Sequence, residues 1–109
     1  YTLSLHDALP ILMSALSGLA EELFFRGAMQ PTLGLGLSTL IFGMLHIGPS
    51  RQFLPWTAFA LLVGLALGWS FQESGTLAAP ITAHLLINLV NMLRLRKRWY
   101  SLQTGPKMH

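Results

Sequence analysis

Long apolar stretches separated by short polar or Gly/Pro-containing breaks dominate this chain. The pattern predicts four helical segments, at about residues 12–30, 37–47, 53–71 and 77–96. Residues 52–72 contain no charged side chain, and a helix of 21 residues at about 1.5 Å per residue is about 31 Å long, close to the thickness of the hydrocarbon core of a bilayer. Residues 74–93 are likewise free of Asp, Glu, Lys and Arg. The pattern therefore favours helices that cross a membrane.

The breaks between these segments contain residues that end helices. We expect the first segment to stop at Pro31 and the pair Gly34 and Gly36, and the second to end at Gly48 and Pro49. A polar turn at residues 72–75 precedes the fourth segment, whose Pro80 falls in the first helical turn, where proline is tolerated. The predicted fold is all-α, a polytopic transmembrane helical bundle of about four helical segments.

Composition supports this fold class. The 109 residues allow one domain at most, and 52% of them are hydrophobic while 10% are charged. Soluble domains carry about 25% charged residues, so a very apolar soluble helical bundle is the less favoured alternative. The chain has no cysteine, which excludes a disulfide framework, a thiolate metal site and a cysteine nucleophile.

The basic residues are concentrated at one end of the chain. Four of the seven Lys and Arg residues directly follow the fourth apolar segment, namely Arg94, Arg96, Lys97 and Arg98. Loops on the cytosolic side of membrane proteins carry such an excess of Lys and Arg, so we expect a cytosolic C-terminus, with residues 99–109 as a polar tail and Trp99 and Tyr100 at the headgroups. The net charge of +3 comes with no nucleic-acid-binding motif, and we expect no nucleic-acid partner.

Residues 1–11 stand apart from the rest of the chain. The string resembles, residue for residue, the translation of a common short-read sequencing adapter, and we interpret it as a library artefact. On this interpretation the natural gene extends upstream, the source is an environmental bacterium, and residues 12–98 form the core of the protein.

Three charged residues lie within the first apolar segment. Glu21, Glu22 and Arg26 would each cost roughly 2.5–3.5 kcal/mol near the centre of a membrane helix, and such residues usually mark function. Glu22 and Arg26 are four residues apart and can pair on one helix face, whereas Glu21 is turned about 100° away. We expect Arg26 to hold Glu22 ionised and Glu21 to face elsewhere as a candidate general base. The alternative for Glu22 and Arg26 is a purely structural ion pair.

Two further polar pairs have the same four-residue spacing. Phe42 and His46 share one helix face, and so do His84 and Asn88. Polar side chains in membrane helices normally face the interior of the bundle, so we expect both histidines to meet Glu21 there, and Asn88 offers an amide donor for an oxyanion. The alternatives are a structural interior role for each histidine and an interhelical hydrogen bond for Asn88.

Other motifs are absent or weak. The chain has no His-Glu-x-x-His zinc motif, no Gly-x-Ser-x-Gly nucleophile elbow and no phosphate-binding glycine loop. Gly64 and Gly68 form a small-xxx-small pair, which would let another helix approach closely.

The polar motifs together resemble the signature of the CAAX prenyl protease and bacteriocin-processing family of intramembrane proteases, also called the CPBP or Abi family. The family motifs are Glu-Glu-x-x-x-Arg, Phe-x-x-x-His and His-x-x-x-Asn or Asp, and the chain meets them in this order from Glu21, Phe42 and His84 onward. The resemblance covers most of residues 12–93. It implies an all-helical membrane endopeptidase that cleaves a membrane-associated peptide or prenylated protein, in the bacterial cytoplasmic membrane.

The resemblance also implies roles for individual residues. Glu21 and His46 would activate the attacking water, His84 and Asn88 would bind the oxyanion, and Glu22, Arg26 and Phe42 would support the site. The family has also been described as metal-dependent, and Glu21, His46 and His84 with a water would satisfy the ligand rules of zinc. We favour the metal-free glutamate mechanism without a cofactor, because these three residues all have roles without zinc.

Family members generally have additional membrane helices before the first motif, so we expect this chain to be a truncated fragment that lacks N-terminal helices and can be inactive. The main alternative function is a non-enzymatic membrane protein, such as a bacteriocin self-immunity factor, that uses the same residues for helix packing or binding. A small transporter or channel fragment is a third possibility.

Overall fold

The computed structural model describes residues 4–106, and every regular secondary-structure element in this range is a helix. In chain order these are α1 (Leu5–Glu22), a π-helical segment η1 (Leu23–Met29), α2 (Gln30–Leu33), α3 (Leu35–Met44), a short 3-10 turn η2 (Arg51–Phe53), α4 (Leu54–Ser74) and α5 (Ala78–Thr104). No strand occurs among the described residues. The predicted all-α class is therefore confirmed.

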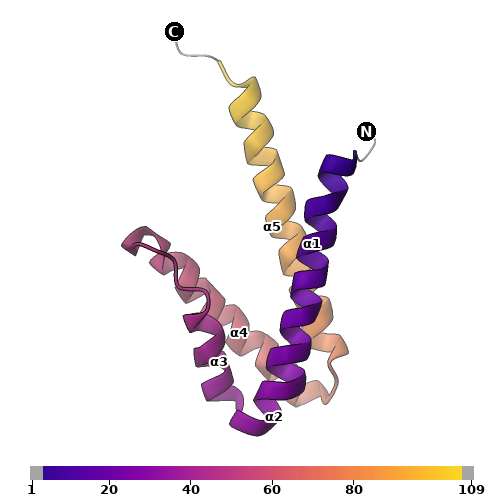
Figure 1. The fold of residues 1–109 in the computed structure, drawn as a ribbon, viewed down its shortest axis with the longest axis vertical. Helices are drawn as coiled ribbons and strands as arrows, with labels where there is room; N and C mark the ends of the chain where they lie inside the picture. Colours follow the sequence, from indigo (N-terminus) through magenta and orange to yellow (C-terminus); the bar gives the residue numbers. More distant parts are fainter. Residues whose placement is uncertain (1–3, 107–109) are drawn as a thin grey trace.

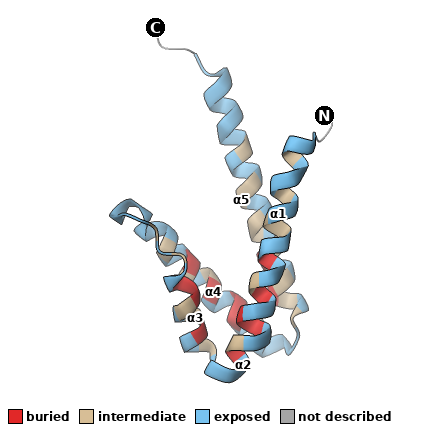
Figure 2. Cartoon of the chain, viewed as in Figure 1, coloured by how far each residue is buried: buried red, intermediate tan, exposed pale blue. Residues whose placement is uncertain are grey.

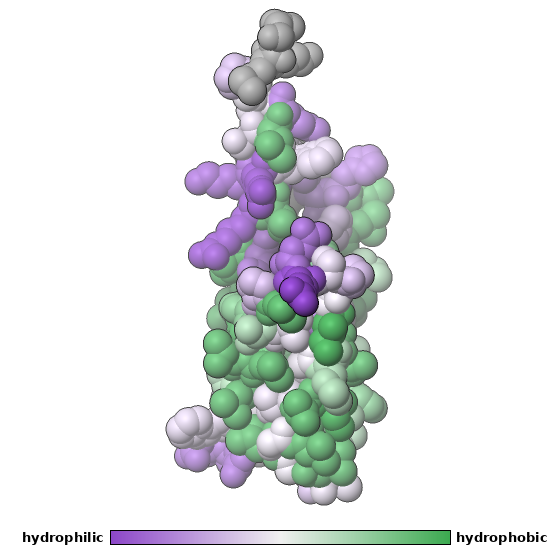
Figure 3. Space-filling view, turned by 90° about the vertical axis from the view of Figure 1, so that its left-hand side faces the viewer, coloured by the Kyte–Doolittle hydropathy of each residue, from purple (hydrophilic) through white to green (hydrophobic). Residues whose placement is uncertain are grey.

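Within residues 4–106, three helices are long and apolar enough to cross a membrane. They cover Leu5–Leu33, Arg51–Ser74 and Ala78–Thr104, whereas α3 is a shorter apolar helix. Figure 3 shows a hydrophobic region over the lower part of the molecule, hydrophilic residues above it and a smaller hydrophilic group at the lower left. An apolar region between hydrophilic groups is expected of a helical bundle that crosses a bilayer.

The helices form two pairs that meet at one end. Helix α1 packs along α5 and α3 packs along α4, while α4 also contacts α5 (Figure 1). Two glycines with positive φ make the sharp connections at the closed end, Gly34 (φ 86°) between α2 and α3 and Gly75 (φ 68°) after α4. These angles lie in the region that glycine adopts most readily.

Buried residues are concentrated where the two pairs meet, as Figure 2 shows. The apolar core contains Phe25, Phe42 and Ala60. Large apolar side chains elsewhere on the helices are exposed, as lipid contact requires; Leu62 is 68% exposed. The small core therefore leaves much of the apolar surface for the bilayer.

Close helix packing depends on glycine at the α3–α4 interface. A Cβ atom on Gly64 would lie 2.8 Å from Phe42 Cδ1, and one on Gly68 would lie 2.8 Å from Gln30 Oε1. A Cβ on Gly43 would overlap Leu61. The close approach predicted from Gly64 and Gly68 is therefore confirmed.

Several predicted helix boundaries were wrong by a few residues. The first helix passes Pro31 and ends only at Gly34, whose φ of 86° breaks the helix. Helix α5 continues past residue 96 to Thr104, because Arg, Lys and Leu are good helix formers. The predicted polar tail therefore begins as helix, while residues 107–109 and residues 1–3 of the adapter-like string lie outside the described residues.

Candidate active site

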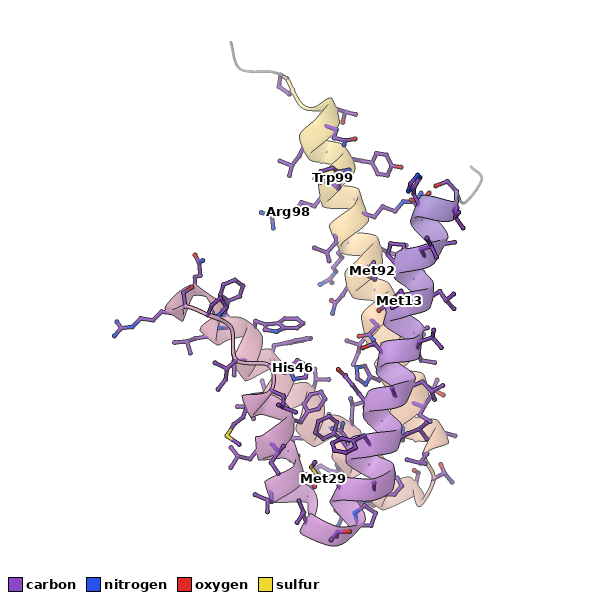
Figure 4. All side chains as sticks on the ribbon, in the orientation of Figure 1. Met13, Met29, His46, Met92, Arg98 and Trp99 are labelled. Carbon is purple, nitrogen blue, oxygen red and sulfur yellow. The ribbon has the colours of Figure 1, made fainter. Side chains whose placement is uncertain are left out.

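One pocket of about 220 Å³ lies between the two helix pairs. Its lining includes the four residues singled out for chemistry, from three different helices or their ends: Glu21, His46, His84 and Asn88. Phe42 also lines it. Figure 4 shows His46 in the space between the α3–α4 pair and the α1–α5 pair. The fold thus brings together residues that are up to 67 positions apart in sequence.

Beneath this pocket, Glu22 is the centre of a buried polar network. Its side chain is fully buried, and Oε1 accepts hydrogen bonds from His84 Nδ1 at 2.6 Å and from Arg26 Nη1 at 3.2 Å. Arg26 Nη2 donates to the Gly64 carbonyl of α4. The network therefore joins α1 and its π-helical extension to both α4 and α5.

Arg26 is held from two sides. Its guanidinium lies 4.9 Å from the centre of the Phe42 ring, within the range of a cation–π interaction. The Phe42 ring in turn lies 4.4 Å from the His46 ring and edge-on to Phe25 at 5.1 Å. Phe42 thus packs between the buried cation and His46, which gives a physical reason for an aromatic residue four positions before His46.

The two adjacent glutamates face different surroundings. Glu22 points into the buried network, whereas the Glu21 side chain is 32% exposed and lines the pocket. Glu21 Oε2 lies 3.3 Å from His84 Nε2, so the His84 ring lies between the two carboxylates. The expected pairing of Glu22 with Arg26 is therefore present, and Glu21 contacts His84. Glu21 and His46 share the lining of the pocket, with no hydrogen bond or ion pair between them among residues 4–106, and His84 contacts both glutamates.

Hydrogen bonds restrict how His46 and Asn88 can act. His46 Nδ1 lies 2.6 Å from the Phe42 carbonyl oxygen, which can only accept, so Nδ1 carries a proton and Nε2 of the neutral ring has a lone pair. Asn88 Nδ2 donates one hydrogen bond to the Ser14 carbonyl at 3.0 Å. An amide nitrogen has two protons, so the second N–H of Asn88 remains for a ligand.

The zinc alternative can be compared with this geometry. Within residues 4–106 no group of three His, Cys, Asp or Glu side chains is placed to hold a metal ion. His84 Nε2 lies 3.3 Å from Glu21 Oε2, and its Nδ1 is bonded to Glu22, as in many histidines that bind a metal through the other nitrogen. In the described residues Glu21, His46 and His84 are not gathered into a three-ligand group.

Several parts of the site were not predicted from the sequence. These include the contact between Glu22 and His84 and the hydrogen bond from Arg26 to the Gly64 carbonyl. They also include Trp56 and Ser17 in the lining of the pocket. A serine four positions before Glu21 was a usable signal, because that spacing puts both side chains on one helix face.

Comparison with known proteins places the chain in a family. The family model described as "Type II CAAX prenyl endopeptidase Rce1-like" matches residues 7–90, which is more than half of the chain. The chain is also 34% identical over 88 residues to "Uncharacterized protein YpbD" of Bacillus subtilis (strain 168). That alignment covers 79% of this chain and 45% of YpbD, so the chain spans less than half the length of this relative. No solved structure matches the chain.

Proposed function

Because this chain belongs to the Rce1-like family of type II CAAX prenyl endopeptidases, as its three motifs predicted, we propose that it carries the catalytic residues of an intramembrane endopeptidase. The observation that carries the proposal is the convergence of Glu21, His46, His84 and Asn88 on one pocket between apolar helices. The substrate would be a prenylated protein or another membrane-associated peptide, and the reaction would be hydrolysis of one peptide bond.

The first step is attack by water on the scissile carbonyl. Glu21 is the exposed carboxylate of the pair, so it accepts a proton from the water, and the lone pair on His46 Nε2 orients the same water by accepting its second hydrogen bond. The water oxygen bonds to the carbonyl carbon, and the carbonyl oxygen becomes an oxyanion.

The oxyanion requires donors that are already in place. The second N–H of Asn88 fills this role, and so does an N–H on His84 Nε2, which lies 3.3 Å from Glu21 Oε2 until that carboxylate takes the proton of the water. Preorganised donors of this kind are worth about 10²–10³ in kcat. Glu22 Oε1, 2.6 Å from His84 Nδ1, holds the His84 ring in place for this role. Glu21 then passes its proton to the leaving amine as the C–N bond breaks, which leaves a carboxylic acid and a free amine.

The buried network positions this machinery. Glu22 and Arg26 do not line the pocket, but they fix the ring of His84 and tie α1 to α4 and α5. We favour a metal-free reaction, because Glu21, His46 and His84 all have roles in it without zinc.

The chain is an integral membrane protein by its family and its helices. We further propose that it lies in the cytoplasmic membrane with its C-terminus in the cytosol. This proposal rests on the four basic residues between positions 94 and 98, in the C-terminal half of α5.

The test is proteolysis by the full-length protein, purified in detergent, on a panel of prenylated and leader peptides. We expect Glu21→Gln to lower kcat by at least 10²-fold, because the proton acceptor is lost, and we expect wild-type cleavage to resist a chelator. An unchanged rate in Glu21→Gln would refute the glutamate mechanism, and cleavage abolished by chelator would assign zinc instead. A folded protein that cleaves no peptide would favour the immunity-factor alternative.

A further inference from the structure

The pocket has two chemically different walls. Helices α1 and α5 supply mainly polar side chains, namely Ser14, Ser17, Glu21, His84, Asn88 and Asn91, together with the apolar Ile87. The α3–α4 side supplies mainly apolar side chains, namely Phe42, Trp56, Phe59, Ala60 and Val63, together with His46 just after α3. Such a division orients any ligand that has one polar and one apolar side.

The polar wall extends beyond the residues assigned to catalysis. Ser17 lies one helical turn before Glu21, and Asn91 lies one turn after Asn88. Within residues 4–106 no hydrogen bond joins either side chain to another residue. Polar groups among membrane helices are costly unless they meet polar partners, and a peptide main chain in the bilayer needs hydrogen-bond partners for the same reason. Ser17 and Asn91 can supply these partners.

The apolar wall lies beside a proposed catalytic residue. The Trp56 ring lies 6.2 Å from the His46 ring and 6.1 Å from the Phe59 ring, and Trp56 is 48% exposed. These two aromatic rings form an apolar surface next to the position of the attacking water. The pocket volume of about 220 Å³ is below the roughly 300–1,000 Å³ of pockets for drug-sized ligands, so it suits one large side chain better than a whole isoprenoid.

We propose that a substrate peptide binds with its main chain on the α1–α5 wall, hydrogen-bonded to Ser17 and Asn91, and with one large apolar side chain next to the scissile bond held against Trp56 and Phe59. This inference rests on the proposed peptidase function. Trp56 is then a specificity-determining residue and Asn91 a peptide-binding residue, and neither takes part in bond cleavage.

The first experiment measures selectivity with the full-length protein. Peptides that carry Leu or Ala next to the scissile bond are compared, each with and without an isoprenoid on a neighbouring cysteine. We expect Trp56→Ala to lower the ratio of kcat/KM for Leu over Ala about tenfold, since apolar contacts discriminate by about 10–200-fold. Trp69→Ala is the matched control, because Trp69 is on the same helix, 57% exposed and outside the pocket lining. An unchanged Leu/Ala ratio in Trp56→Ala overturns the assignment, and so does a fall confined to the ratio of prenylated over unprenylated peptides.

The second experiment measures binding without cleavage. In Glu21→Gln protein with every tryptophan except Trp56 replaced by phenylalanine, we expect the Leu peptide to shift the Trp56 emission to shorter wavelength in a saturable way. Adding Asn91→Leu should raise the Kd of the Leu and Ala peptides alike, by about tenfold, because it removes a main-chain contact. If Glu21→Gln binds the peptides saturably but the protein with Glu21 intact cleaves none of them, the peptidase proposal fails and the two-walled pocket stands. Peptide binding that leaves the Trp56 emission unchanged would sink the pocket inference alone.

Discussion

Replacing Arg26 with methionine removes the cation from the buried network while keeping a side chain of similar length. Arg26 is 2% exposed and Glu22 is fully buried, so water cannot replace the lost partner. The substitution deletes the hydrogen bond to Glu22 Oε1, the bond to the Gly64 carbonyl and the contact with the Phe42 ring. Glu22 keeps His84 as a partner at 2.6 Å, while its Oε2 atom is buried with no hydrogen-bond partner in residues 4–106.

Breaking a buried ion pair by removing one partner typically costs about 3–5 kcal/mol, because an uncompensated charge stays behind. The remaining bond to His84 moderates this penalty, so we expect Arg26→Met to lower the free energy of unfolding by about 3 kcal/mol. Adding Glu22→Gln removes the stranded charge, so the double variant should recover part of that loss, with a coupling energy of about 2 kcal/mol.

The assay is unfolding in mixed micelles, with a denaturing detergent titrated against the purified protein and helix content followed by circular dichroism. Arg94→Met is the control, because Arg94 is exposed near the end of α5 and its loss should change the free energy by less than about 0.5 kcal/mol. The reasoning fails if Arg26→Met stays within about 1 kcal/mol of the wild type, or if the double variant is no more stable than Arg26→Met.

Two further predictions concern packing and the oxyanion. Gly43→Ala should destabilise the protein by about 1–3 kcal/mol, because its Cβ would overlap Leu61. Gly36→Ala is the control on the same helix: its Cβ has open space around it, so the change should be neutral or stabilising by up to about 1 kcal/mol. Equal effects of the two substitutions in the same detergent titration would contradict the α3–α4 packing. Asn88→Ala should lower kcat by about 10²–10³ in steady-state assays with little change in KM, and a kcat within threefold of the wild type would remove Asn88 from the oxyanion site.

Local features of the chain were predictable from sequence. A membrane helix satisfies its own backbone hydrogen bonds, so hydropathy alone located the helices to within a few residues at most ends, although α5 runs about eight residues beyond its predicted end. The pairing of Glu22 with Arg26 followed from a spacing of four residues on one helix. Family membership followed from three short motifs, each of which lies within one helical segment or at its end.

Contacts between helices were not predictable in the same way. His84 and Glu22 are 62 residues apart, and Arg26 and Gly64 are 38 apart, so both contacts depend on how the helix pairs assemble. No residue type in the sequence predicts the π-helical segment Leu23–Met29, which follows Glu22 and contains Arg26. Segments of this kind often occur at functional sites, and here the altered helical turn begins directly after the two glutamates.

The polar contacts of Glu22 and Arg26 both hold the helices together and form the floor of the site. Lipid provides little hydrophobic drive for helices to associate, so polar contacts and close glycine packing must join α1, α4 and α5. Substituting Glu22 or Arg26 should therefore lower stability and turnover together. Glu21 lines the pocket and is partly exposed, so its substitution should lower turnover while the bundle stays folded. A loss of activity at Glu22 is thus not evidence of a chemical role, whereas the same loss at Glu21 in a folded protein is.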